Sequence, residues 1–126
     1  MRQVVVSLVV LGLICGLGVW SNKLLQESAQ NLVSLIDMAA VEIKADRWEE
    51  AENHIRELEE AWNRHVDWWS IILNHQEIDN IEFSLGRCRE YVASRDKTLS
   101  LGQLSELRIM VEHIPDKEAV TWKNIL

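Results

Sequence analysis

Residues 4–20 read Val-Val-Val-Ser-Leu-Val-Val-Leu-Gly-Leu-Ile-Cys-Gly-Leu-Gly-Val-Trp, and no charged residue lies between Arg2 and Lys23. A helix rises about 1.5 Å per residue, so this stretch and its flanks cover the roughly 30 Å hydrocarbon core of a bilayer. Behind it the sequence becomes polar and periodic. We therefore expect three segments: a transmembrane anchor at 1–22, a helical domain at 23–114 and a C-terminal tail at 115–126.

The apolar stretch has to be distinguished from a cleaved signal peptide. A signal peptide has an apolar core of about 7–15 residues that ends in a small-x-small cleavage site. This stretch is longer, and its one candidate site is the poor Gly16-Leu17-Gly18. Trp20 lies where aromatic side chains gather at a membrane interface. The sequence favours an uncleaved signal anchor, with a cleaved signal as the alternative.

Charges on either side of the span predict its orientation in the cell membrane. Arg2 and the α-amino group precede it, whereas Lys23 is the basic residue that follows closely. The positive-inside rule then places the N-terminus in the cytoplasm and the domain outside. Gly12 and Gly16 form a Gly-x-x-x-Gly pair, which lets two helices approach closely, although a loosely packed single span is the simpler interpretation. The expected membrane-facing residues are Val4, Leu8, Leu11, Gly12, Gly16 and Trp20.

Composition restricts the classes of partner. The formal net charge is −7, and the acidic excess lies after the span. An acidic domain is repelled by anionic lipid and by nucleic acid, so we expect no nucleic-acid partner and a domain that stands off the bilayer. Cys15 lies in the span and Cys88 beyond it, which excludes a disulfide framework. Cys88 is best interpreted as a small buried apolar residue.

The part after the span is predicted to be all-α. Pro115 is the sole proline, and Gly86 and Gly102 are the only glycines there. Apolar residues recur at helical spacing in four stripes, which short turns would join into an antiparallel bundle of helix hairpins, tetratricopeptide-like in outline. The stripes are Leu25, Leu32, Ile36, Ala39 and Ile43; Trp48, Ala51, Ile55, Leu58, Trp62, His65, Trp69 and Ile72; Ile78, Ile81, Leu85, Cys88 and Val92; and Leu101, Leu104, Leu107, Val111 and Ile114.

Helix ends can be predicted at three places. The second and third stripes are out of phase, and Asn74 with Glu77 resembles a helix cap with its partner, so we expect a break there. One long helix with a rotating apolar face is the alternative. Thr98 is the candidate cap of the last helix, and Pro115 is expected to end it.

The segment His75-Gln76-Glu77-Ile78-Asp79-Asn80-Ile81-Glu82, the run Glu112-His113-Ile114-Pro115 and the ending Asn124-Ile125-Leu126 resemble a domain-of-unknown-function family. Its members are short bacterial proteins, chiefly from spore-forming Gram-positive lineages, with one N-terminal membrane helix. The resemblance covers nearly the whole chain and implies the architecture, but no activity and no site residues. The association of such genes with a multi-span membrane protein of the YetF type implies a membrane-protein partner.

One constellation has the spacing of metal ligands. His75, Asp79 and Glu82 lie at i, i+4 and i+7, on one face of the third predicted helix. Imidazole and carboxylate groups on one helix face can bind a divalent metal ion with one or two further ligands. The alternative is an acidic helix N-terminus favoured by the helix dipole. No cofactor is expected.

Aromatic residues provide the candidate interaction site. Trp48, Trp62 and Trp69 share an apolar stripe with His65 and are expected in the core. His65 would then be hydrogen-bonded and structural, with a pH-sensitive role as the alternative. Trp68 points roughly 100° away from its neighbour and either anchors a protein interface or fills the edge of the bundle. The candidate partner-binding residues are Trp68, His75 and Trp122.

The absence of known catalytic motifs restricts the functional hypotheses. The sequence has no Gly-rich phosphate loop, Gly-x-Ser-x-Gly elbow, His-Glu-x-x-His motif or Cys-x-x-Cys pair, so we expect a protein that is not an enzyme. The first hypothesis is an interaction module that serves as accessory subunit of a larger membrane protein. The second is an extracytoplasmic domain that binds or senses a divalent metal. The third is a homo-oligomeric structural protein of the envelope.

Overall fold

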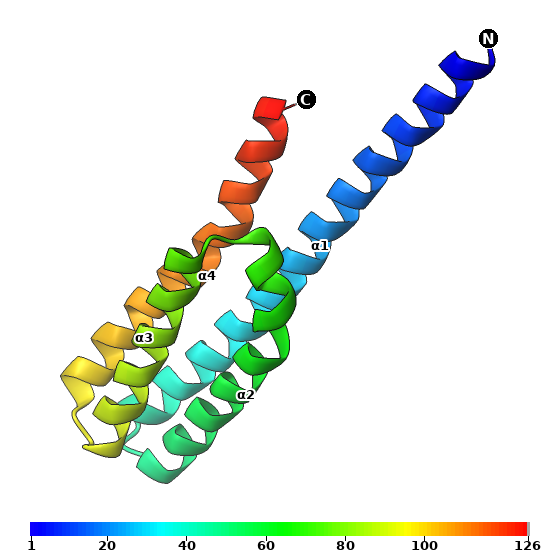
Figure 1. The fold of residues 1–126 in the computed structure, drawn as a ribbon. Coiled ribbons are helices and arrows are strands. Elements are labelled where there is room, and N and C mark those ends of the chain that lie inside the picture. Colours follow the sequence, from blue (N-terminus) through cyan, green and yellow to red (C-terminus); the bar gives the residue numbers. More distant parts are fainter. Residues whose placement is uncertain (126) are drawn as a thin grey trace.

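The chain folds into four α-helices in an up-down-up-down arrangement (Figure 1). The computed structural model describes the backbone of residues 1–125 and the side chains of residues 1–114. The helices are α1 (Arg2–Lys44), α2 (Trp48–Ile72), α3 (His75–Ala93) and α4 (Lys97–Ile125). Helix α1 packs against α2 and α4, and α3 packs against the same two helices. The bundle is therefore a closed ring of four helices, which confirms the all-α antiparallel prediction.

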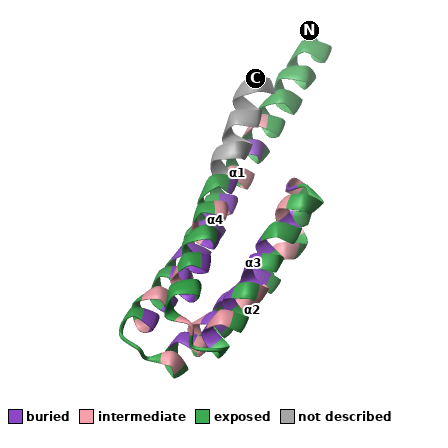
Figure 2. Cartoon of the chain, turned by 90° about the vertical axis from the view of Figure 1, so that its left-hand side faces the viewer, coloured by how far each residue is buried: buried purple, intermediate pink, exposed green. Residues whose placement is uncertain are grey.

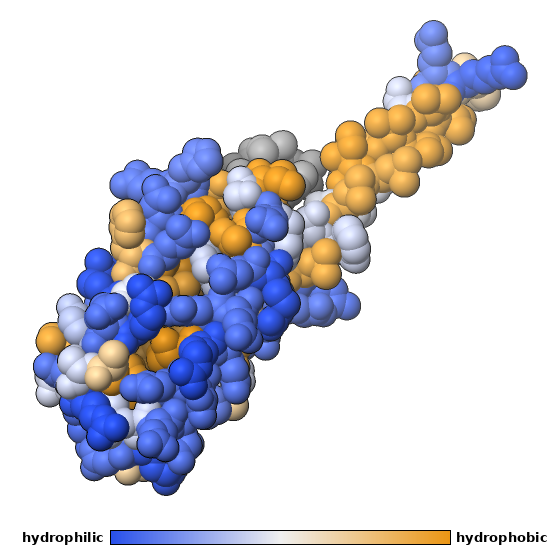
Figure 3. Space-filling view, turned by 60° about the horizontal axis from the view of Figure 1, so that its bottom comes forward, coloured by the Kyte–Doolittle hydropathy of each residue, from blue (hydrophilic) through white to orange (hydrophobic). Residues whose placement is uncertain are grey.

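Helix α1 joins the apolar segment to the bundle without a break. It runs for 43 residues, and its C-terminal half contributes Leu25, Leu32 and Ile36 to the core, each 1% exposed. The N-terminal part projects beyond the other helices, and its surface is apolar (Figure 3). By length and composition α1 can cross a membrane, a property that signal sequences near an N-terminus share.

The predicted stripes form the core, which lies along the inner faces of all four helices (Figure 2). Helix α2 contributes Ala51, Ile55, Leu58, Trp62 and Trp69, none more than 3% exposed. The stripes of α3 and α4 are buried as predicted, except that Leu101 is half-buried. Trp48 and Ile72, the first and last residues of α2, are also half-buried, and so is His65.

Two turns of one kind close the end of the bundle that is distant from the apolar segment. In the α1–α2 turn, Arg47 N–H donates to the Glu42 carbonyl at 2.9 Å and Asp46 has φ 60°. In the α3–α4 turn, Asp96 N–H donates to the Tyr91 carbonyl at 3.0 Å and Arg95 has φ 57°. Both are Schellman-type helix ends with a left-handed residue that is not glycine.

The α2–α3 connection lies at the other end of the bundle, on the side of the apolar segment (Figure 1). Helix α2 ends at Ile72 and α3 begins at His75, so the break is confirmed and the single long helix is wrong. The Asn74 side chain accepts a 2.8 Å hydrogen bond from Glu77 N–H, as the predicted cap requires.

Two predicted helix ends are wrong. The side chain of Asp96, not of Thr98, caps α4, since its Oδ1 accepts a 2.9 Å hydrogen bond from Leu99 N–H. Helix α4 also continues beyond Pro115 to Ile125. A proline removes one backbone donor and disturbs the preceding turn, but it does not prevent helix on either side.

Candidate functional site

A groove between α1 and α2 lies near the apolar segment and has a volume of about 550 Å³. We call it the juxtamembrane groove. Its lining surface is mostly apolar. It is lined by Trp20, Ser21, Leu24, Glu27, Ser28 and Asn31 from α1, and by His65, Trp68 and Ile72 from α2.

Aromatic rings form the α2 side of the groove. Trp69 lies behind Trp68, with ring centroids 6.1 Å apart and planes at 83°, and meets Trp62 edge-to-face at 5.4 Å. His65 stacks on Trp69 at 6.4 Å with an interplanar angle of 24°. Edge-to-face and stacked pairs at these separations are favourable arrangements of aromatic rings. The groove wall is therefore a packed aromatic cluster.

A buried hydrogen bond joins the two walls. Trp69 Nε1 donates to Ser28 Oγ at 3.0 Å. The Ser28 hydroxyl also lies 3.0 Å from the carbonyl oxygens of Leu24 and Leu25, to which it can donate. This bond fixes the last turns of α2 against the first turns of α1 beyond the apolar segment, and Trp68, one residue from Trp69, is positioned with them.

His65 is a polar group within this apolar wall. Its Nε2 is buried and has no hydrogen-bond partner among the side chains described, contrary to the expectation of a hydrogen-bonded core histidine. Burial lowers the pKa of His65, and the nearby positive charge of Arg64 lowers it further. The ring is therefore neutral at pH 7.

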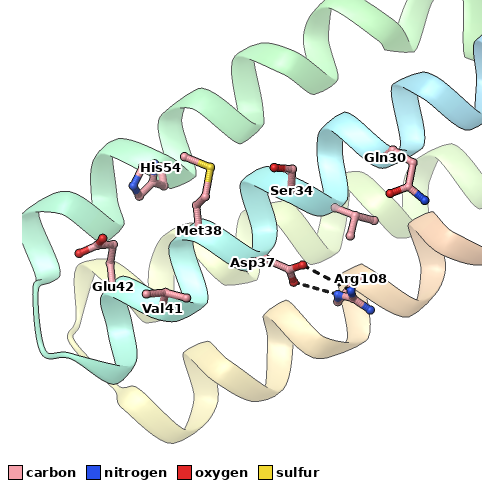
Figure 4. A pocket seen from close by; sticks show the side chains of 9 residues that line it. Gln30, Ser34, Asp37, Met38, Val41, Glu42, His54 and Arg108 are labelled. Carbon is pink, nitrogen blue, oxygen red and sulfur yellow. Dashed lines mark hydrogen bonds and ion pairs between the residues drawn. The ribbon is translucent and has the colours of Figure 1, made fainter.

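A second hollow, of about 480 Å³, lies over α1 and is bordered by α2 and α4 (Figure 4). An ion pair crosses one side of it: Arg108 donates to the Asp37 carboxylate at 2.8 and 3.4 Å. This hydrogen bond raises the pKa of Arg108. His54 Nδ1 is 3.6 Å from the Glu57 carboxylate, too far for a hydrogen bond. The Asp37 and Arg108 side chains are about half-exposed, whereas His54 Nδ1 is buried and has no hydrogen-bond partner among the described residues.

The predicted metal ligands are not gathered into a site. His75, Asp79 and Glu82 are all exposed on α3. Within the described residues, no group of three His, Cys, Asp or Glu side chains is placed to hold a metal ion. Glu82 lies instead toward α2, where its carboxylate is 3.5 Å from Trp62 Nε1.

The other predicted site residues are dispersed. Trp68 lines the juxtamembrane groove, whereas His75 is exposed and does not. The Trp122 side chain lies outside those described. Gly12 and Gly16 face open space, since a Cβ at either would meet nothing within 4 Å. The predicted membrane-facing residues Val4, Leu8, Leu11 and Trp20 are between 53% and 63% exposed.

Sequence reasoning missed most of the groove. Leu24 and Ile72 line it, but in the sequence they are only members or neighbours of core stripes. A signal was present in α1: Leu24 and Trp20 continue the spacing of apolar residues in the span. Recognising a groove also required α2 to lie beside them, and that is a property of the fold.

The comparisons with known proteins define a family and nothing more. The model of a family described as a domain of unknown function, DUF4363, matches residues 19–125. No curated protein and no solved structure matches the chain. The match begins where the juxtamembrane groove begins and leaves out most of the apolar segment.

Proposed function

The chain belongs to the DUF4363 family of unknown function, and from its own geometry we propose that it is a membrane-anchored interaction module, an accessory subunit of a larger membrane protein. In this proposal α1 crosses the cell membrane once, with its N-terminus in the cytoplasm. The four-helix domain stands outside the membrane, and the juxtamembrane groove binds the partner.

The observation that supports this role is the position of the groove. Trp20 is 59% exposed and ends the apolar segment, and it also lines the groove together with Trp68. Half-exposed indoles beside a hollow are typical anchors of protein interfaces. Ile71, in the same last turns of α2, is 84% exposed. A membrane protein at this height of the bilayer can contact all of these residues at once.

The test is co-purification from native membranes in a mild detergent. Trp68→Ala removes the groove wall and is expected to lose a specific membrane protein that the wild-type chain retains. Trp48→Ala is the matched control, because Trp48 is a half-buried indole at the opposite end of the same helix. The proposal is wrong if no membrane protein is enriched, or if both variants lose it equally.

The orientation is tested in intact cells with a membrane-impermeant maleimide. Ser105 is exposed on α4, so Ser105→Cys in a Cys15→Ala background provides a reactive thiol on the domain. We expect labelling without lysis. Labelling only after the membrane is opened would place the domain in the cytoplasm.

A further inference from the structure

Helix α1 carries an apolar seam that leads from the span into the juxtamembrane groove. Its residues alternate in spacing between four and three, the repeat by which two helices pack side by side. The seam consists of Val6, Val10, Leu13, Leu17, Trp20 and Leu24, followed at the same spacing by Glu27 and Asn31. The last four of these residues line the groove.

None of the side chains that the structure describes covers this seam along the apolar segment. Val6, Leu13 and Leu17 are 60%, 62% and 60% exposed, and Val10 is 48% exposed. Asp37, which binds Arg108 of α4, is far from the seam in angular position, whereas Glu27 at the end of the seam also lines a hollow with Glu112 of α4. With respect to the described side chains, the seam is thus an uncovered ridge that ends between α1 and the aromatic wall of α2.

We infer that the seam and the juxtamembrane groove together bind one apolar transmembrane helix of a second membrane protein. This inference rests on the proposed function and adds the kind of element that is bound. In a bilayer, helices associate by close packing and by polar contacts, not by hydrophobic exclusion of water. A continuous ridge that ends in a preformed cleft offers such packing over both the membrane and the interface.

The charge of Glu27 indicates which kind of residue follows the apolar segment of the bound helix. Glu27 lies at the edge of the groove and has no ion pair with any side chain that the structure describes. A Lys or Arg one turn beyond the apolar segment of the bound helix would lie beside this carboxylate. The neutral His65 and the exposed Asn31 provide further hydrogen-bonding groups nearby.

The same charge disfavours a second copy of this chain. In a parallel symmetric pair, identical seam positions face each other, so Glu27 would meet Glu27. Like charges at such a position oppose association. Gly12 and Gly16 lie away from the seam, so a homo-oligomer built on them would use another face of the span.

The experiment is a photo-crosslinking scan in native membranes. Crosslinkers at Leu13 and Leu17 probe the seam, and crosslinkers at Leu8 and Leu11 are matched controls on roughly the opposite side of the same helix, equally exposed. A crosslinker at Trp68 reports on the groove. We expect both seam positions and Trp68 to capture one membrane protein, through peptides of one apolar helix, with several-fold lower yield at the control positions.

The other outcomes overturn the inference in distinguishable ways. If Trp68 captures a membrane protein while the seam captures only lipid, or no more than the control positions do, the seam assignment is wrong and the proposed function stands. Capture of a second copy at the seam assigns it to self-association. If neither Trp68 nor the seam captures a membrane protein, the proposed function fails as well.

The charge argument has its own test. Glu27→Gln is expected to reduce the seam crosslink several-fold. Glu49→Gln, an exposed carboxylate at the far end of α2, is the control and should leave it unchanged. An unchanged crosslinking yield in both variants would contradict the inference that a Lys or Arg of the bound helix lies beside Glu27.

Discussion

Trp69 and Ser28 are 41 residues apart in the sequence and are joined by a buried 3.0 Å hydrogen bond from the indole Nε1 to the hydroxyl oxygen. Trp69 is 0% exposed and Ser28 is 6% exposed. This buried polar contact between α1 and α2 lies directly behind the juxtamembrane groove. It therefore links the stability of the bundle to the shape of the groove.

Ser28→Ala is expected to lower the free energy of unfolding by about 1–3 kcal/mol, because it leaves the buried indole N–H without an acceptor. Ser70→Ala, an exposed serine on α2, is the control and should change it by less than about 0.5 kcal/mol. The measurement is urea unfolding of the detergent-solubilised chain, followed by tryptophan fluorescence. Equal effects of the two substitutions would mean that the buried bond contributes nothing.

The α3–α4 turn predicts a stabilising substitution. Arg95 has φ 57°, a left-handed conformation that favours glycine. Arg95→Gly relieves this strain but adds freedom to the unfolded chain, so we expect a net gain of about 0.5–1 kcal/mol. Arg56→Gly, within α2, should instead lose about 1 kcal/mol, since glycine is a poor helix former. Thermal unfolding of both variants tests whether Arg95→Gly raises the stability and Arg56→Gly lowers it.

His65 predicts a pH dependence of stability. Its pKa is lowered on folding from the ordinary value of 6.5, mainly by burial, so the unfolded chain takes up a proton at a higher pH than the folded chain. The free energy of unfolding contributed by this residue therefore falls as the pH decreases below about 6.5. We expect His65→Gln to flatten the decline between about pH 7.5 and pH 5.5.

The measurement is the urea midpoint of wild-type and His65→Gln chains at several pH values. His113→Gln is the matched control, because it makes the same change at an exposed histidine of α4. Parallel pH profiles for the wild type and His65→Gln would contradict the assignment of the decline in stability to His65.

Cys88 predicts slow thiol chemistry in the folded state. It is 0% exposed, and burial raises its pKa to about 12, so almost no thiolate exists at pH 8. In a Cys15→Ala background, maleimide labelling should be slow in buffer and fast in concentrated urea. Adding Ser28→Ala should speed labelling in buffer, because the open state becomes more populated. Fast labelling of the folded parent would show that Cys88 is accessible.

Local patterns predicted the helices but not the groove. The four stripes and the Asn74 cap could be predicted because apolar spacing and capping chemistry are properties of neighbouring residues. The end at Pro115 was wrong because a proline weakens a helix without being certain to stop it. Asp96 was missed because two polar residues near one helix start compete to cap it, and backbone geometry decides between them.

Contacts between distant segments explain the rest. The pairing of Ser28 with Trp69 depends on how α1 and α2 are aligned along each other, which no local pattern states. The same holds for Gln103 of α4, whose amide donates to Ser84 Oγ of α3 at 2.7 Å within the bundle. In the sequence both residues look like ordinary polar positions. The metal hypothesis rested on spacing along one helix, and among the described residues no group of three His, Cys, Asp or Glu side chains is placed to hold a metal ion.

The unbroken course of α1 has a mechanical consequence. A helix of 43 residues is about 65 Å long, and neither glycine nor proline interrupts it between Val19 and Lys44. The apolar segment and the part of α1 that packs in the bundle therefore form one stiff rod. In the proposed transmembrane arrangement, tilt of the rod within the bilayer swings the distant α1–α2 turn sideways, and rotation about its axis turns the aromatic wall with it. Bilayer thickness, or the helix beside which the rod lies, would thereby set the direction in which the domain points.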